Sequence, residues 1–334
     1  MDVLTNFAGT FVSQLQSPTL AFLIGGMVLA ATGSKLTIPD AIYRFIIFVL
    51  LMSIGLHGGM EIREADLAAL ALPAILAALT GCLCVLVGWL TLTRLPNVEF
   101  DDAIATAGLF GAVSASTLAA AIIVLQEQEI DFEAWAPALY PFMDIPALVL
   151  AIVLASLHAQ KRSGKSGEKP KVRAIIADSL RGSALSALLL GLAIGLLTQP
   201  AAIYDEFYNP LFRGLLSILM LILGMEAYTR LAELRGVAHW FAIYALVAPI
   251  LHGLIGFALG YVAHVTVGLS PGGVIILAVI AASNSDISGP PTLRAGIPNA
   301  NPSSFIGAST SIGTPIAIAV CIPLFTALAE LVFV

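Results

Sequence analysis

Charged residues are scarce in this sequence. Asp, Glu, Lys and Arg make up 11% of the 334 residues, whereas 59% of the residues are hydrophobic. Soluble domains average about 25% charged residues. A chain this apolar cannot cover its own surface with polar groups, so the scarcity of charge excludes a water-soluble globular protein. We predict that a lipid bilayer is its solvent.

Several motifs of enzymes and pumps are also missing. Without a GxxxxGK[ST] loop, an NTP-driven machine is disfavoured. Without a GxSxG elbow or paired carboxylates beside a base, we predict that the chain is not an enzyme. The histidines form no HExxH or similar cluster, which favours satisfied or interfacial positions for His57, His239, His252 and His264. The cysteines have no zinc or redox spacing, which favours packing roles for Cys82, Cys84 and Cys321.

Long apolar segments fill most of the chain. A helix of about twenty apolar residues crosses the roughly 30 Å hydrocarbon core of a bilayer. Ten segments meet this criterion: 18–34, 39–59, 66–92, 102–126, 135–159, 180–199, 208–229, 237–266, 272–296 and 303–331. We predict an all-α integral membrane protein with ten transmembrane helices, no organic cofactor and no nucleic-acid partner. No basic region precedes the first apolar stretch, so we expect no cleaved signal peptide.

Positive charges predict the orientation, because Lys and Arg near helix ends stay on the cytoplasmic side. The most basic stretch lies midway along the chain and also contains Gly, Ser and Pro, which is typical of a flexible linker. With this linker (160–173) inside and ten alternating helices, only Arg63 and Arg213 of the 15 Lys and Arg residues fall outside. We therefore place both termini outside, on the periplasmic face of the plasma (inner) membrane.

The linker separates two halves of five helices each, 1–159 and 174–334. Because each half has an odd number of spans, any repeat must be inverted in the membrane. Short matches occur in the same order in both halves: Gly26 with Gly191, Gly59-Met60-Glu61 with Gly224-Met225-Glu226, Ser114 with Ser283, and Ile145-Pro146-Ala147 with Thr314-Pro315-Ile316. Inverted repeats with discontinuous helices are typical of secondary transporters. Chance similarity in a low-complexity apolar sequence is the alternative.

The fourth and ninth segments contain the most polar stretches at membrane depth. They read GAVSAST over 111–117 and ASNSDISGPPT over 282–292. The two prolines cannot complete the backbone ladder of a continuous helix, and Ser288 before Gly289 predicts the start of a half-helix. We predict that helices 4 and 9 are discontinuous, and that their free N–H groups form an anion site without Lys or Arg. Small residues that only permit close helix packing are the alternative.

Asp286 and Asp144 are carboxylates at membrane depth, where charged groups are costly and usually functional. Each could bind a cation together with nearby amide or hydroxyl oxygens: Asn284, Ser309, Thr310, Ser311 and Thr314. An all-oxygen set favours a hard ion such as Na⁺ over a transition metal. The alternative for Asp144, which lies between Pro141 and Pro146, is that it caps a broken helix.

Five stretches resemble the cyanobacterial-type sodium-dependent bicarbonate transporter family. The similarity extends over nearly the whole chain and is most specific at 108–117, 136–146, 209–226, 281–298 and 309–323. The resemblance implies a ten-helix inverted-repeat fold, with helices 1, 2, 6 and 7 as a gate domain and helices 3–5 and 8–10 as a core domain. It also implies a homotrimer that imports bicarbonate with sodium in a CO₂-concentrating mechanism. Inhibition by a PII-like protein that senses adenine nucleotides on the cytoplasmic face is implied as well.

Together with this resemblance, the polar residues predict two adjoining sites. Bicarbonate is expected at Gly111, Ser114, Ser116, Thr117, Ser283 and Ser285, with adjacent backbone N–H groups. Sodium is expected at Asp286, Asn284, Thr310, Ser311, Thr314 and Asp144. One accompanying Na⁺ cancels the cost of importing an anion into a negative-inside cell, roughly 2.3 kcal/mol per 100 mV. The alternatives are a sodium symporter for another small anion such as a short carboxylate, a channel, or a membrane sensor that binds solute without moving it.

The predicted topology can be tested with an epitope tag attached at Val334. We expect an antibody added to intact cells from outside to bind the tag, because an even number of spans returns the chain to its starting side. A tag that becomes reachable only from the cytoplasm would contradict the ten-span orientation.

Overall fold

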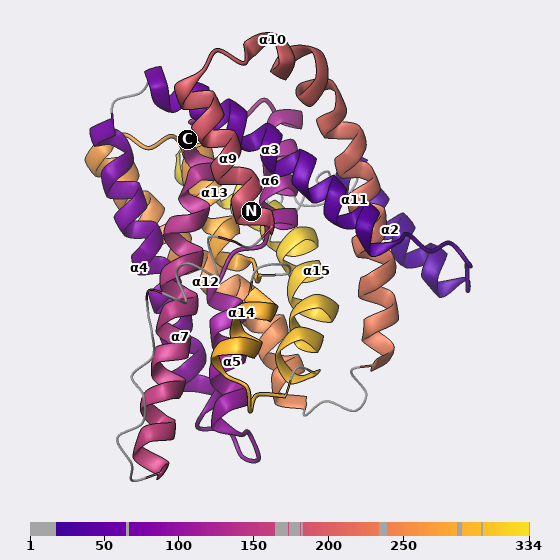
Figure 1. The fold of residues 1–334 in the computed structure, drawn as a ribbon, viewed down its shortest axis with the longest axis vertical. Helices are drawn as coiled ribbons and strands as arrows, with labels where there is room; N and C mark the ends of the chain where they lie inside the picture. The colour runs from indigo at the N-terminus through magenta and orange to yellow at the C-terminus, as the bar shows by residue number, and fades with distance from the viewer. Residues whose placement is uncertain are drawn as a thin grey trace.

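A computed structural model describes residues 18–64, 67–163, 173, 181, 183–233, 239–285, 289–301 and 303–333 (Figure 1). This described part contains helices and no strand, as the sequence predicts. Asp286, Ser288, most of the predicted linker and both chain ends lie outside the described residues.

The helices follow the predicted segments closely. In the first half they are α2 (Pro18–Ala31), α3 (Asp40–Glu64), α4 (Leu67–Leu92), α5 (Phe100–Gly111), α6 (Ala115–Glu127), η1 (Ala136–Ala138) and α7 (Leu139–Ser163). The second half begins with α9 (Ser183–Leu197), α10 (Ala201–Ile203), η2 (Tyr204–Tyr208), α11 (Asn209–Glu233), α12 (His239–Val267), α13 (Pro271–Ala282) and α14 (Gly289–Gly296). It ends with η4 (Ser303–Gly307), η5 (Ser309–Gly313), α15 (Thr314–Ile316), η6 (Ala317–Cys321) and α16 (Ile322–Val332).

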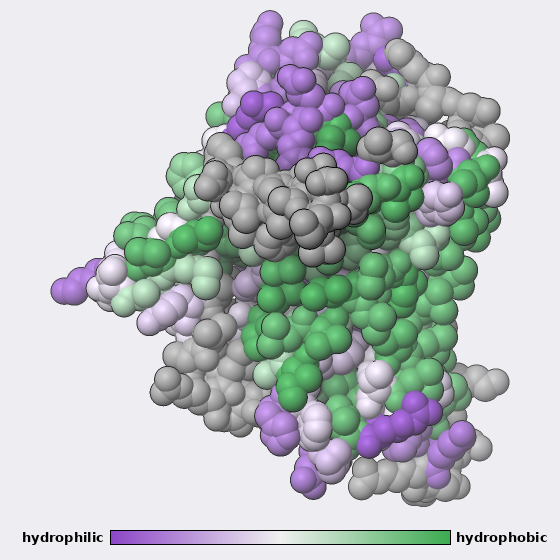
Figure 2. Space-filling model, turned by 180° about the vertical axis from the view of Figure 1, so that it is seen from behind, coloured by the Kyte–Doolittle hydropathy of each residue, from purple (hydrophilic) through white to green (hydrophobic). Residues whose placement is uncertain are grey.

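The lengths and surfaces of these helices suit a bilayer. Within the described residues, seven helices are long and apolar enough to cross a membrane. Three shorter apolar helices, Ala21–Ala31, Ser186–Leu197 and Pro271–Ala282, lie in three further predicted segments. Figure 2 shows a broad apolar band between polar ends, and large apolar side chains such as Ile75 (64%) and Leu197 (79%) stay exposed. The chain is therefore a multi-pass membrane protein, whereas ten spans in an inverted repeat remain a prediction.

Helices α3 and α9 pack backbone to backbone through four glycines. Gly55 and Gly59 of α3 lie against Gly191 and Gly195 of α9, each pair spaced four residues apart. A Cβ on Gly195 would lie 2.9 Å from the Cα of Gly59, and a Cβ on Gly191 would lie 3.0 Å from the Cα of Gly55. Such small-residue stripes let helices approach closely where lipid removes the hydrophobic driving force.

Helices α2 and α11 are paired in the same manner. A Cβ on Gly26 would lie 3.0 Å from the amide nitrogen of Met225, and a Cβ on Gly224 would lie 3.0 Å from that of Met27. The first helix of each half therefore packs on the second helix of the other half. We call α2, α3, α9 and α11 the glycine-paired helices.

The remaining helices form a second group, in which α4 contacts α5, α7 and α12, and α12 packs on α13. Two carboxylates join its helix ends. Asp102 at the start of α5 accepts hydrogen bonds from the Asn301 amide (2.7 Å) and the Ser304 hydroxyl (3.0 Å). Glu133 accepts from the amide (2.7 Å) and hydroxyl (2.8 Å) of Ser270, the N-cap of α13. We call α4, α5, α6, α7, α12, α13, α14 and the segments from η4 to α16 the core helices.

The glycine contacts predict a specific loss of stability. We expect Gly59→Ala and Gly195→Ala to lower the free energy of unfolding by about 1–3 kcal/mol each, because the new methyl group overlaps opposing backbone. Gly214→Ala in α11 is the matched control, since a Cβ there meets nothing within 4 Å. Alanine is the better helix former, so this control should be neutral or slightly stabilising. Thermal melting in detergent measures both, and equal melting temperatures would contradict the packing.

Candidate functional site

The span made of α5 and α6 is interrupted in the protein interior. Helix α5 ends at Gly111, and the backbone at Ala112 (φ −92°, ψ 163°) and Ser114 (φ −92°, ψ 122°) is extended. Helix α6 begins at Ala115, where the Ser114 Oγ accepts a hydrogen bond from the Thr117 amide at 3.1 Å. Residues 103–125 are all buried, so the break is shielded from lipid by protein. The predicted discontinuity of the fourth segment is thus present.

The ninth segment is interrupted as well. Helix α13 ends at Ala282, residues 283–285 are not helical, and α14 begins at Gly289, as the sequence predicts. The Ser285 Oγ accepts a hydrogen bond from the Gly289 amide at 2.8 Å, so a serine again satisfies the first turn of a half-helix. Asp286, the main predicted sodium ligand, falls outside the described residues of this break.

The two breaks lie against each other. The Ser114 amide donates to the Ser283 Oγ at 2.9 Å, and the Ser285 amide donates to the Leu109 carbonyl at 3.0 Å. Helix α13 also packs against α6, and α14 packs against α5. Backbone groups freed by one interrupted span are therefore satisfied by the other, which an apolar interior requires. We call this contact the crossing.

Asp144 and Gly111 lie beside the crossing. Asp144 of α7 is fully buried, and its Oδ1 accepts a hydrogen bond from the Val113 amide at 2.9 Å. The carboxylate therefore binds one of the amides that the break in the fourth segment frees. A Cβ on Gly111 would lie 2.6 Å from the Cγ2 of Val85 in α4, so this glycine permits close packing.

Asn284 links the crossing to the tenth span. Its side-chain amide lies 2.5 Å from the Ser309 Oγ and 2.9 Å from the Thr314 Oγ1. With the amide nitrogen facing these hydroxyls, the amide oxygen accepts from the Thr314 backbone N–H at 3.2 Å, so we assign this orientation. The structure brings these three predicted oxygen-bearing residues together. The Thr310 hydroxyl instead donates to the Ile306 carbonyl at 2.8 Å.

Two neighbours of Asn284 are not apparent from sequence. A Cβ on Gly313 would lie 2.7 Å from the Asn284 amide and 2.8 Å from the ring of Phe110, so only glycine leaves this space. The position of Gly313 directly before Thr314 and Pro315 is the one signal in the sequence that could have indicated this contact.

His252 is buried, and its Nδ1 lies 3.1 Å from the Phe110 carbonyl, which agrees with the interpretation of a satisfied histidine.

Two hydroxyls of the predicted site have no partner within the described part of the chain. The Thr117 Oγ1, in the first turn of α6, and the Ser311 Oγ, in η5, are buried and make no hydrogen bond. Leaving such a group unsatisfied costs about 1–3 kcal/mol, so a buried orphan calls for an explanation such as a bound ligand or water. Ser311 also lies in a π-helical turn, a geometry that is frequent at functional sites.

The geometry fits a small anion together with a hard cation. The helices α6 and α14 both begin at the crossing, where the positive ends of their dipoles lie, and α5 and α13 both end there with their carbonyls. The described residues hold no group of three His, Cys, Asp or Glu side chains suited to a metal. Hydroxyl, amide and carbonyl oxygens remain as ligands, and these favour Na⁺ over a transition metal.

Helices broken at membrane depth around polar groups are characteristic of secondary transporters. The sequence model of the Na⁺-dependent bicarbonate transporter superfamily matches residues 18–330, and the chain belongs to this superfamily. No curated protein matches the chain significantly. Membership makes the chain a transporter and not an enzyme, and it supports sodium-coupled bicarbonate transport in general.

The orphan hydroxyls give a test that separates binding from stability. We expect Thr117→Val and Ser311→Ala to reduce transport at least tenfold, about 1.4 kcal/mol, while leaving the melting temperature of the solute-free protein unchanged or higher. Neither hydroxyl makes a hydrogen bond to another described residue, so neither variant loses one there. Thr326→Val is the control, because its buried hydroxyl donates to the Ile322 carbonyl (2.9 Å) and should not affect transport. Full activity in both site variants would contradict the assignment.

Proposed function

We propose that this protein imports bicarbonate together with Na⁺ by alternating access around the crossing. The observation that carries the proposal is the pair of mutually satisfied breaks, where the Ser114 amide meets the Ser283 hydroxyl at 2.9 Å. Such a site can hold ions at membrane depth without exposing irregular backbone to lipid.

Bicarbonate binding is assigned to the N-terminal ends of the half-helices. The dipoles of α6 and α14 and their free N–H groups favour a monovalent anion. The hydroxyl groups that we assign to it are those of Ser114, Ser116, Thr117, Ser283 and Ser285. The unpartnered Thr117 hydroxyl supports this choice most directly, whereas the packing of Gly111 against α4 gives that residue a supporting role.

Sodium binding is assigned to the oxygen-rich side of the crossing. Asp286 supplies the negative charge, with Asn284, Ser311 and Thr314 as neutral ligands. The contacts of Asn284 with η5 and α15 support this grouping, because they bring the residue beside the hydroxyl-bearing side chains of the tenth span. Asp144 and Thr310 keep a secondary role, since each already makes a hydrogen bond to backbone.

Alternating access would use the two groups of helices as moving parts. The glycine-paired helices are tightly packed and correspond to the proposed gate domain, and the core helices carry the site. Helix α11 contacts η5, and α3 contacts α6, so both contacts join the gate to segments of the site. Sliding at these contacts would expose the crossing to one side at a time. The homotrimer, the PII-like regulator and the role in carbon accumulation remain predictions from the family resemblance.

Uptake of labelled bicarbonate into proteoliposomes tests the proposal. We expect an inward sodium gradient to drive accumulation, and we expect Asp286→Asn to abolish the sodium stimulation without preventing assembly, because the variant lacks the charge that holds Na⁺. Asp101→Asn, at the start of α5, is the matched control and should transport normally. Sodium-independent bicarbonate flux in the unmodified protein would contradict the symport mechanism. Stronger competition by a short carboxylate than by bicarbonate would favour the other small-anion substrate.

A further inference from the structure

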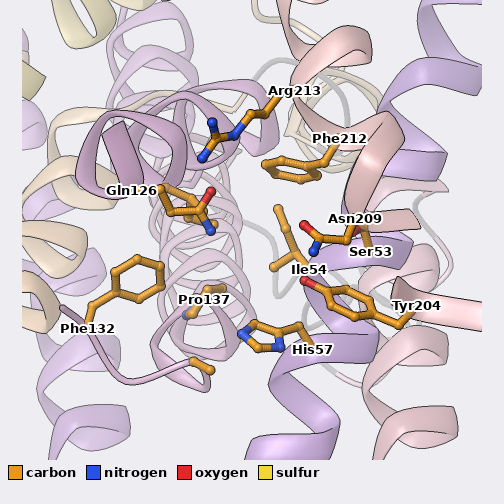
Figure 3. A pocket seen from close by; sticks show the side chains of 12 residues that line it. Ser53, Ile54, His57, Gln126, Phe132, Pro137, Tyr204, Asn209, Phe212 and Arg213 are labelled. Atoms are coloured by element: carbon orange, nitrogen blue, oxygen red, sulfur yellow. The ribbon is translucent and has the colours of Figure 1, made fainter. Parts of the chain in front are cut away.

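A polar cavity lies away from the crossing, between the two groups of helices (Figure 3). It has a volume of about 180 Å³ and is bounded by α3, η2 and the start of α11 on one side, and by the end of α6 and η1 on the other. Gln126 lines it eleven residues beyond Ala115, the first residue of α6. At 1.5 Å per residue the cavity lies about 16 Å along α6 from the break. The predicted topology places it on the outer side, and we call it the outer cavity.

Among the described residues that line the outer cavity, Arg213 is the one with a formal charge. It is also one of the two basic residues that the topology places outside. No carboxylate in the described part of the chain forms an ion pair with it, although Glu127 is near enough to interact electrostatically. Arg213 therefore brings a positive charge to the cavity wall, and such a charge attracts anions.

Neutral donors surround this charge. Figure 3 shows the Arg213 guanidinium near the Gln126 amide, with Asn209 and Tyr204 across the cavity. Ser53 of α3 is only 2% exposed, lines the cavity and makes no hydrogen bond within the described residues. Its hydroxyl can therefore donate a hydrogen bond to a polar solute in the cavity. The size is below the roughly 300–1,000 Å³ of sites for drug-sized ligands, so a small solute fits.

We propose that the outer cavity is an entry site that binds a small oxyanion before it reaches the crossing, with Arg213 as its selectivity determinant. The guanidinium provides charge and paired N–H donors for oxygen atoms. Gln126, Asn209 and Ser53 provide the remaining donors. Identifying this oxyanion as bicarbonate rests on the proposed function, whereas the anion selectivity of the cavity does not.

Uptake kinetics give the first test. We expect Arg213→Gln to raise the KM for bicarbonate about fivefold to tenfold at low ionic strength, with a smaller effect on the maximal rate. The variant lacks the positive charge that concentrates anions at the entrance in the unmodified protein. Arg213→Lys should keep most of the affinity. Arg63→Gln removes the other basic residue that the topology places outside. Arg63 does not line the cavity, so this control should leave the KM unchanged. A wild-type KM in Arg213→Gln would overturn the proposal.

Cysteine labelling in intact cells gives a second test that does not require transport. Asn209→Cys is introduced after Cys82, Cys84 and Cys321 are replaced by alanine. The new cysteine is then labelled with two thiosulfonate reagents, one that carries an anionic sulfonate group and one that carries a cationic ammonium group, and the two reaction rates are compared. We expect the anionic reagent to react faster, and Arg213→Gln to remove this preference. Ala202→Cys is the control, because it is exposed in α10 beside Asp205 and Glu206 and should favour the cationic reagent.

The two tests separate the possible failures. Anion-selective labelling at Asn209→Cys together with no sodium-stimulated bicarbonate uptake by the wild-type protein would overturn the proposed function and leave the outer cavity standing. A cationic preference at Asn209→Cys, or a ratio of rates that Arg213→Gln does not change, would overturn the entry site even if bicarbonate transport is demonstrated.

Discussion

The pairing of backbone groups inside an apolar medium is the constraint on which this structure depends. A helix that stops at membrane depth leaves N–H and C=O groups that lipid cannot satisfy. Here two interrupted spans satisfy each other, through the Ser114 amide with Ser283 and the Ser285 amide with Leu109. Asp144 binds one more freed amide. Because the breaks are closed in this way, a polar site without buried Lys or Arg can exist in the interior.

The same constraint explains how the helices around the site are built. Lipid does not drive helices together, so close contact must come from shape, and the glycines of α3 and α9 provide it. The core helices instead use polar contacts at their ends, such as Asp102 with Asn301 and Ser304. Two kinds of packing therefore meet where α11 contacts η5. The π-helical turns of the tenth span lie at this junction, where the chain lacks the amide donor of Pro315.

Sequence reasoning succeeded where a single residue dictates local geometry. Pro290 and Pro291 predicted an interrupted ninth span, and the match of Ser114 with Ser283 carried that prediction to the fourth, which has no proline. The assignment of Gly111 to the bicarbonate site stays a prediction. Its close packing against Val85 of α4 is a tertiary contact that no local pattern around Gly111 encodes.

The sequence alone determined the solvent, the helical class, the positions of the apolar segments and the two polar stretches, because composition and local propensity act within one helix. Only the tertiary structure decided which polar groups meet. Ser114 reaches Ser283 across 169 positions and Asn284 reaches Ser309 across 25, and both contacts depend on how neighbouring helices pack. The outer cavity around Arg213 exists for the same reason, since five separate elements, α3, α6, η1, η2 and α11, come together around it.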